Sequence, residues 1–227
     1  MARGRFQWGD DMADSNDARQ IGEVLDFWFP EGRALDIDPD RHAEHWRWRM
    51  HGGADGAIAA RFGPLTERGA AGDLDHWAGT QEGRLALIVV LDQFPRSLWR
   101  GSALAYAQDP AALAQALAGL DNGDWAALGL PWFQIGFTQP LGHAEGPDHL
   151  ARINRLIALR NDIAARAPAT LQPLYASLVD QAGKVRRVIA RFGRHPHRNA
   201  ILGRNPTPEE EAYLQGGDFP HQRAFRE

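Results

Sequence analysis

Residues 173–192 read PLYASLVDQAGKVRRVIARF, and this stretch indicates the fold class more clearly than any other. Six apolar residues recur at helical spacing and fall on one face: Leu174, Leu178, Ala182, Val185, Ile189 and Phe192. Four basic residues fall nearly opposite: Lys184, Arg187, Arg191 and Arg194. The pattern predicts an amphipathic helix that ends at Gly193, because glycine favours a C-terminal cap.

Similar patterns predict helices along almost the whole chain. They cover residues 17–29, a segment that starts at Asp38-Pro39, a segment through 58–65 interrupted at Gly63-Pro64, then 80–91, 110–119, 148–166 and a short segment from Thr207 to Gly216. Residues 120–146 are irregular and predict a loop or a set of short helical turns. No long run alternates with period two, so we expect an all-α array of about nine helices paired as helical hairpins.

Composition narrows the class of protein further. The chain has 227 residues and no cysteine, which excludes disulfides, Cys-ligated metal sites and thiol nucleophiles. The longest apolar run, 85–91, is too short to cross a membrane, which takes about 20 residues. We expect a disordered leader over residues 1–16, one helical domain over 17–217, a tail over 218–227, and a cytoplasmic location.

Charge is unevenly distributed along the sequence. The net charge of −4 combines −10 over residues 1–151, +9 over residues 152–204 and −3 over the remainder. A cationic zone of this density attracts phosphate or carboxylate groups. The alternative is that these arginines simply coat the solvent face of a helix.

A carboxylate follows the apolar run directly. Because Asp92 comes after seven apolar residues, it has to be paired or hydrogen-bonded if it is buried. Arg96 and Arg100 are four residues apart, so their guanidinium groups point the same way if a helix resumes after Pro95. Two interpretations stay open: an anion clamp oriented by Asp92, or an internal Asp–Arg bridge that ties two helices together.

A second polar pair lies in the Gly-bracketed loop 140–146. His143 and Glu145 are residue types that supply a general acid and base when they are partly buried. The loop leads into a helix, and helix N-termini favour bound anions. A core histidine beside an exposed capping glutamate would give the same sequence.

The third polar segment, residues 191–204, reads RFGRHPHRNAILGR. Its arginines suit bidentate binding of phosphate or carboxylate, and Asn199 adds an amide. His195 and His197 have a spacing found in metal sites, but the surrounding arginines repel a cation, so we expect no metal. The sequence also lacks the common phosphate-loop, dinucleotide, zinc-protease and hydrolase motifs, and we expect no cofactor.

These three segments, in this order, resemble the Domain of Unknown Function 924 family of bacteria and fungi. VLDFWF at residues 24–29 belongs to the same resemblance, which spans about residues 21–215. The strings LDQFPR at 91–96 and PHRNAILGR at 196–204 are long and specific. The resemblance implies an all-helical, tetratricopeptide-like fold.

The resemblance also implies an activity, since certain fungal relatives are arginine-containing cyclodipeptide synthases that join two aminoacyl groups taken from tRNA. Such an enzyme needs a basic surface for RNA, an acid for the arginine substrate and a proton shuttle. Asp92 or Glu145 is then the acid, and His143 the shuttle. Relatives continue the loop with a run like SEDxxDQE, whereas this chain reads AEGPDHLA at 144–151, so part of the acidic run is absent.

We therefore expect one pocket where the three segments converge. Its orienting or proton-transferring residues are expected to be Asp92, His143, Glu145 and His197, and its anion-binding residues Arg96, Arg100, Arg191, Arg194, Arg198, Asn199 and Arg204. The most specific function is tRNA-dependent aminoacyl transfer, with tRNA or a small anion as partner. The alternatives are a sensor of an acidic metabolite and a peptide-binding scaffold whose groove is lined by Trp28, Trp46, Trp48, Trp132 and Phe133.

Overall fold

The structure, a computed structural model, describes residues 8–34 and 36–217. All regular elements in these ranges are helices and none is a strand, which confirms the all-α prediction. The α-helices are α1 (Trp8–Trp28), α2 (Pro39–Met50), α3 (Asp55–Ala71), α4 (Gln81–Ile88), α5 (Phe94–Leu98), α6 (Asp109–Asp121), α7 (Asp124–Leu128), α8 (Pro131–Thr138), α9 (Pro140–His143), α10 (His149–Arg166), α11 (Gln172–Phe192) and α12 (Pro208–Gln215). Within the described ranges, nine of these helices have eight or more residues.

The first helix begins earlier than the sequence predicts. Residues 8–16, expected to belong to a disordered leader, form the first turns of α1. These residues contain no proline, so nothing in the backbone stops the helix from extending back from Asp17. Residues 1–7 of the expected leader and the expected tail, 218–227, lie outside the described residues.

Several helices begin or end at the capping residues that the sequence predicts. The Asp38 side chain accepts hydrogen bonds from two backbone N–H groups at the start of α2. The Thr80 side chain accepts one such bond, from the Gly83 N–H of α4, and Thr207 forms a reciprocal capping box with Glu210 at α12. Gly193, with φ of 69°, ends α11 in the left-handed conformation that glycine adopts without strain. These ends depend on local chemistry alone.

The third helix corrects the sequence prediction at Pro64. Helix α3 runs through this residue without interruption. Pro64 itself is exposed, whereas Ile58, Phe62 and Leu65 on the other face are buried in the core. Burial of that apolar face outweighs the lost backbone hydrogen bond.

Helix α4 lies at the centre of the molecule. Residues 85–90 are fully buried, and α4 packs against α1 and α6. The chain then passes through a π-turn, Val89–Gln93, in which the Phe94 N–H bonds to the Val89 carbonyl. Such turns are rare and concentrate at functional sites. This turn carries Asp92 and Gln93 into the interior.

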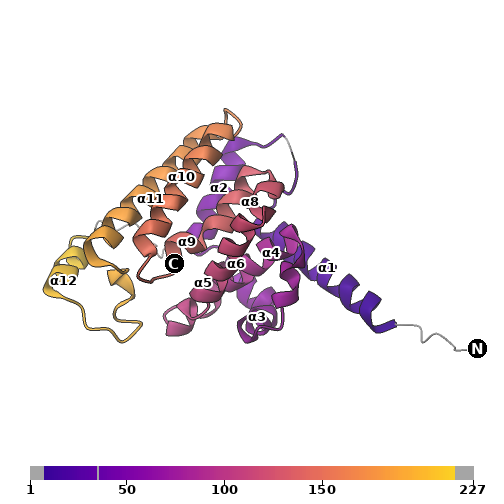
Figure 1. Cartoon of the computed structure of the whole chain (residues 1–227), viewed down its shortest axis with the longest axis horizontal. Coiled ribbons are helices and arrows are strands. Elements are labelled where there is room, and N and C mark those ends of the chain that lie inside the picture. Colours follow the sequence, from indigo (N-terminus) through magenta and orange to yellow (C-terminus); the bar gives the residue numbers. More distant parts are fainter. Residues whose placement is uncertain (1–7, 35, 218–227) are drawn as a thin grey trace, which may run out of the picture.

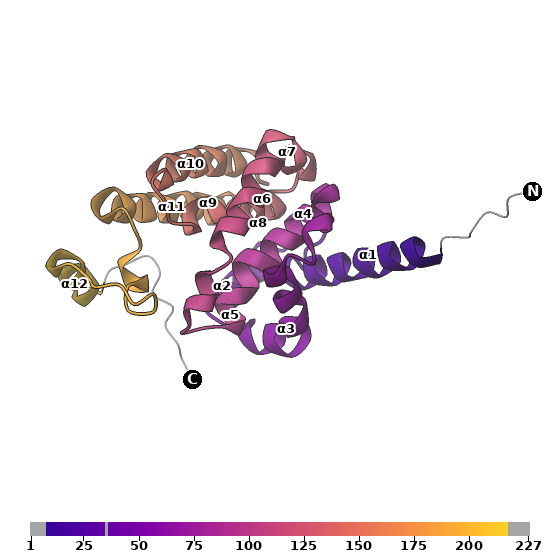
Figure 2. The ribbon, with the colours of Figure 1, turned by 60° about the horizontal axis from the view of Figure 1, so that its bottom comes forward.

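The rest of the chain packs around this centre. Helices α10 and α11 form a hairpin along one side of the molecule, and α12 lies at its far end (Figures 1 and 2). Ile153, Val185 and Ile189 join the two helices of this pair in a small apolar cluster. The irregular segment 120–146 forms the short helices α7, α8 and α9, the second of its two predicted forms. A tetratricopeptide-like arrangement of the pairs stays a prediction. None of the described helices has both the length and the apolar character needed to span a bilayer.

Candidate functional site

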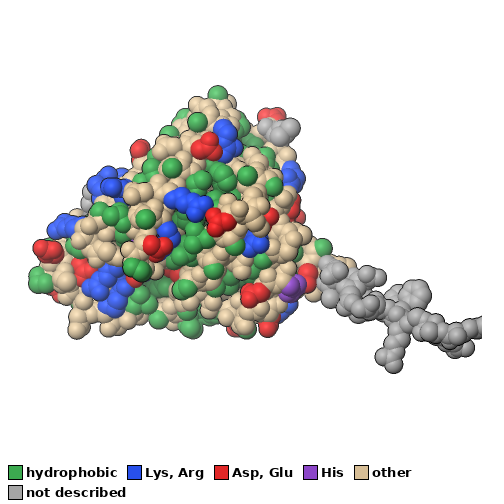
Figure 3. All heavy atoms as spheres, viewed as in Figure 1, with side chains coloured by type: hydrophobic (Ala, Val, Ile, Leu, Met, Phe, Trp, Pro, Cys, Tyr) green, Lys and Arg blue, Asp and Glu red, His purple; other side chains and the backbone are tan. Residues whose placement is uncertain are grey.

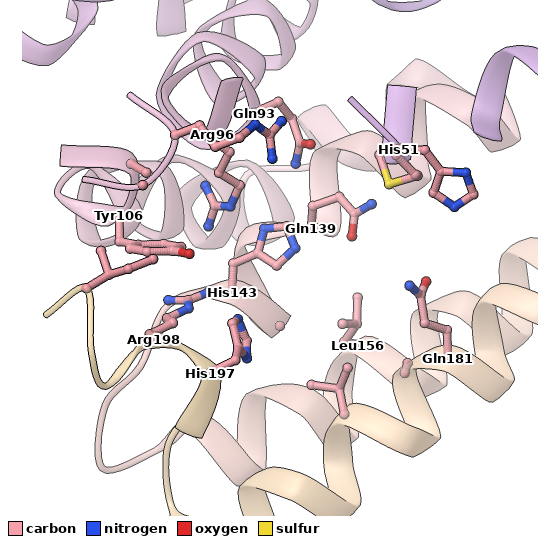
Figure 4. A pocket seen from close by; sticks show the side chains of 18 of the residues that line it. His51, Gln93, Arg96, Tyr106, Gln139, His143, Leu156, Gln181, His197 and Arg198 are labelled. Atoms are coloured by element: carbon pink, nitrogen blue, oxygen red, sulfur yellow. The ribbon is translucent and has the colours of Figure 1, made fainter. Parts of the chain in front are cut away.

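A cavity of about 550 Å³ lies between the end of the central helix and the α10–α11 pair. Residues from α2, the π-turn, α5, α9, α10 and α11 line it, together with the 3₁₀ segments Ala103–Tyr106 and Pro196–Arg198 (Figure 4). Its polar lining consists of His51, Gln93, Arg96, Arg100, Tyr106, Gln139, His143, Arg160, Gln181, His197 and Arg198. Leu156, Val185 and Ile201 contribute to an apolar wall.

All three polar segments of the sequence reach this cavity. The first supplies Gln93, Arg96 and Arg100, the second His143, and the third His197 with Arg198. The geometry brings together residues more than 100 positions apart in the chain, as a catalytic or binding site requires. Figure 4 shows the ring of His143 in the middle of this group, between Gln139 and Arg198.

His143 is held by a buried carboxylate. Its Nδ1 lies 2.8 and 2.9 Å from the two carboxylate oxygens of Asp92, whose exposed fraction is 0%. The Gln93 amide donates to the same carboxylate, and Arg96 Nη1 lies 3.3 Å from it. Asp92 does not itself line the cavity and is connected to it through its contact with His143.

Charges around this pair set the pKa of both groups. Burial raises the pKa of Asp92, but Arg96, His143 and Gln93 outweigh burial and hold it at about 2. Burial lowers the pKa of His143, and the positive charge of Arg96 adds to that effect against the opposing Asp92. The pair therefore consists of a carboxylate and a neutral imidazole near pH 7. An imidazole that donates Nδ1–H to a carboxylate presents Nε2 as a hydrogen-bond acceptor.

A second buried carboxylate joins two arginines of the cavity wall. Asp109 accepts from Arg96 at 2.7 Å and from Arg198 at 2.9 Å. Tyr106 lies against both cations, with ring-centroid distances of 5.7 Å to Arg96 and 4.3 Å to Arg198. The internal Asp–Arg bridge weighed for the first segment is thus present, with Asp109 as its main acceptor.

Arg100 does not share the partner of Arg96. Helix α5 ends at Leu98, so Arg100 lies beyond it and donates from Nε to Asp55 at 2.9 Å. Both arginines border the cavity, but the condition for their alignment along one helix face is not met, because Arg100 lies beyond α5. The helix is too short to enforce it.

Arg160 is a cavity residue that the sequence analysis missed. Its guanidinium donates to the Leu178 carbonyl at 2.8 Å and to the Gln139 side-chain oxygen at 2.7 Å. Burial lowers the pKa of Arg160 to about 10, and within residues 8–34 and 36–217 no carboxylate offsets that effect. Its position offers a signal that could have identified it, because Arg160 falls on the apolar face of α10 between Leu156 and Ile163.

The remaining predicted site residues do not line the cavity. Glu145 binds Arg204 and accepts from the backbone N–H of His195 at 2.7 Å. Arg194 and Asn199 both donate to Glu210 of α12. Arg191 is exposed on α11. These contacts fasten the basic segment to the body of the molecule, and acidic side chains lie among the basic ones around α11 and α12 in Figure 3.

The cavity lining is basic, and His197 within it is uncharged. Its lining contains four arginines and no Asp or Glu. Burial and the charge of Arg198 lower the pKa of His197 to about 3, which keeps this ring neutral. In the described ranges, no group of three or more His, Asp or Glu side chains is placed to hold a metal ion.

Comparison with known proteins identifies the family. A solved structure of a protein of unknown function from Agrobacterium tumefaciens is 32% identical and superposes with a TM-score of 0.67, covering 88% of this chain and 99% of that one. No curated protein matches the sequence. Residues 24–218 match the family described as bacterial proteins of unknown function (DUF924). The chain belongs to this family, as its three polar segments indicate.

Proposed function

We propose that the cavity binds a small carboxylic acid, with Arg160 as the central cation. The observation that carries this proposal is the burial of Arg160, which is 4% exposed, borders a cavity and has no carboxylate partner among the described residues. A buried cation is costly unless an anion or several hydrogen bonds compensate it. Its Nε has no hydrogen-bond partner within the described residues. A bound carboxylate would supply the missing negative charge.

The surroundings of Arg160 favour a small organic acid. The other three arginines of the lining already face three carboxylates: Arg96 pairs with Asp92 and Asp109, Arg198 with Asp109, and Arg100 with Asp55. The wall therefore has about one positive charge in excess, which suits a single carboxylate. Gln139 and Gln181 offer amide groups, and Leu156 offers apolar surface for the body of the ligand. A volume of about 550 Å³ fits a small molecule.

Calorimetric titration tests this proposal. We expect 4-hydroxybenzoate to bind and 4-hydroxybenzamide, which has the same shape without the charge, to bind at least tenfold more weakly. Arg160→Gln should weaken acid binding about 10- to 100-fold, because a charge-assisted hydrogen bond contributes about 1.5–3 kcal/mol. Arg166→Gln is the matched control, since Arg166 lies on the same helix but pairs with Asp162 at the surface. Equal affinity for the acid and the amide would contradict the proposal.

The tRNA-dependent activity implied by the resemblance has less support. It requires an acidic group to hold an arginine side chain, and the two expected residues, Asp92 and Glu145, are both committed to internal partners. Neither borders the cavity. This activity predicts an arginine-containing cyclic dipeptide in extracts of an expressing host, which mass spectrometry would detect.

The peptide-binding scaffold also has less support. Four of the five aromatic residues expected to line its groove are core residues: Trp28, Trp46, Trp132 and Phe133. Trp48 is exposed, but one exposed aromatic side chain does not form a groove. The four buried aromatic side chains pack in the core instead.

A further inference from the structure

We propose that the cavity is an active site in which His143 acts as a general base and water hydrolyses an ester that carries a carboxylate. This inference rests on the acid-binding function proposed above. It starts from the contact of His143 with Asp92, a carboxylate that the acid-binding proposal does not use. A His–carboxylate pair on a cavity wall is an arrangement that favours proton transfer.

The contacts of His143 determine which of its ring nitrogens can accept a proton. Nδ1 is occupied by Asp92, and no hydrogen bond of Nε2 is present within the described residues. The side chain is 22% exposed and borders the cavity, so Nε2 is open to it. Asp92 cannot rotate away easily, because Gln93 and Arg96 also bind it. The imidazole is therefore oriented in advance, with its accepting nitrogen toward the ligand.

The composition of the lining limits which side chains could form a covalent intermediate with a substrate. It contains no Ser, Thr, Lys, Asp or Glu, and the chain has no Cys. An acyl-enzyme on Ser, Thr or Cys and a Schiff base on Lys are thus excluded for this lining. In the proposed reaction water is the nucleophile, and the His143 base activates it. Gln139 and Arg198, which lie on either side of the ring in Figure 4, provide N–H groups for developing negative charge.

The reaction step balances without an additional reactant. His143 Nε2 takes one proton from water as the water oxygen forms a bond to the acyl carbon, and the carbonyl electrons move onto the carbonyl oxygen. When the carbonyl re-forms, the bond to the leaving oxygen breaks. The imidazolium returns its proton to that oxygen. The products are an acid and an alcohol, and Asp92 stabilises the imidazolium throughout.

Hydrolysis of 4-acetoxybenzoate is the test. This ester carries a carboxylate, and release of 4-hydroxybenzoate is measured by chromatography; phenyl acetate is the uncharged comparison. We expect His143→Gln to slow hydrolysis of the charged ester about 100-fold or more, the usual contribution of a general base. We expect His76→Gln, in an exposed side chain paired with Asp17, to have no effect. Phenyl acetate should react at least tenfold more slowly than the charged ester.

The pH profile provides a second measurement. The wild-type rate should fall as His143 becomes protonated, at a pH set by Asp92, Arg96 and Asp109 around it, and the His143→Gln variant should lose this ionisation. Asp92→Asn should change the profile as well, because Asp92 positions the ring. A merely structural role of either residue would leave the profile unchanged.

Binding and catalysis fail in distinguishable ways. If 4-hydroxybenzoate binds the wild type and His143→Gln equally and both hydrolyse the ester at the same rate, the catalytic inference is overturned and the acid-binding function stands. If the wild type binds no acid, the acid-binding function fails and the catalytic inference falls with it. Retained acid binding by His143→Gln also shows that this variant is folded.

Discussion

At the scale of single residues, Asp109 is the buried carboxylate that two arginines of the cavity wall share. It is buried and accepts hydrogen bonds from Arg96 and Arg198, which come from separate segments of the chain. Removal of one partner from a buried ion pair leaves an uncompensated charge. Without Asp109, Arg198 would lose the carboxylate it is paired with, and Arg96 would keep Asp92. This single carboxylate joins the 3₁₀ segment Pro196–Arg198 to the centre of the fold.

Asp109→Asn is expected to reduce the free energy of unfolding by about 3–5 kcal/mol, because it removes the charge shared by two buried arginines and keeps the side-chain shape. Urea denaturation measures this change. Asp162→Asn is the matched control, since Asp162 forms an exposed pair with Arg166, and its loss should cost less than about 1 kcal/mol. A similar small cost for both variants would mean that the Asp109 bridge contributes no net stability.

At the scale of elements, α3 shows how packing overrides a local signal. Pro64 stands in the interior of this helix, where it removes a backbone hydrogen bond, yet the helix continues through it. Since the side chain is exposed, replacing it leaves the core unchanged. By contrast, Pro173 stands in the first turn of α11, where the missing N–H has no helical partner to lose.

We expect Pro64→Ala to raise the free energy of unfolding by about 1–3 kcal/mol, because it restores the hydrogen bond and relieves the clash with the preceding turn. The melting temperature from circular dichroism measures this effect. Pro173→Ala should leave stability unchanged or lower it by less than about 1 kcal/mol, as the unfolded chain gains freedom. An equal response of the two variants would argue against strain at Pro64.

The contrast between local capping signals and long-range packing explains how much of the molecule could be predicted from sequence. Helix ends at Asp38, Thr80, Gly193 and Thr207 follow from neighbouring residues, so their sequence signals were sufficient. The π-turn has no such signal. For the site, sequence selected Arg96, His143 and Arg198, which line the cavity, but also Glu145 and Arg204, which bind each other across 59 positions. Only the folded structure shows that such distant charges cancel.

At the scale of the whole molecule, buried neutral histidines make stability depend on pH. Burial, against the opposing hydrogen bond to the Gly142 carbonyl, lowers the pKa of His149 from 6.5 to about 4, and burial together with Arg198 lowers that of His197 to about 3. The unfolded chain takes up protons at these residues below about pH 6.5, and the folded chain does not. Acid therefore favours the unfolded state.

We expect the free energy of unfolding to be highest above about pH 6.5 and to fall as the pH drops toward 4. Each histidine contributes up to about 1.4 kcal/mol per pH unit to this fall. Glu210, whose pKa is held at about 2 by Arg194 and the Thr207 backbone against burial, adds to the loss below about pH 4.5. Calorimetric melting temperatures from pH 8 to 4 measure the slope. His149→Gln should flatten it between pH 6.5 and 4; an unchanged slope would exclude His149 as its source.

The π-turn places a constraint on the length of the polypeptide. It holds one more residue between its hydrogen-bonded ends than an α-helical turn does. The wider turn takes up this additional residue, so the helix after it keeps its rotational phase relative to α4. If the same residues formed a regular α-helix, Arg96 would be rotated by about 100° about the helix axis, although no side chain of the cavity had been exchanged. The π-turn and the number of residues in 89–93 are therefore matched, and the site depends on residue count as well as on residue identity.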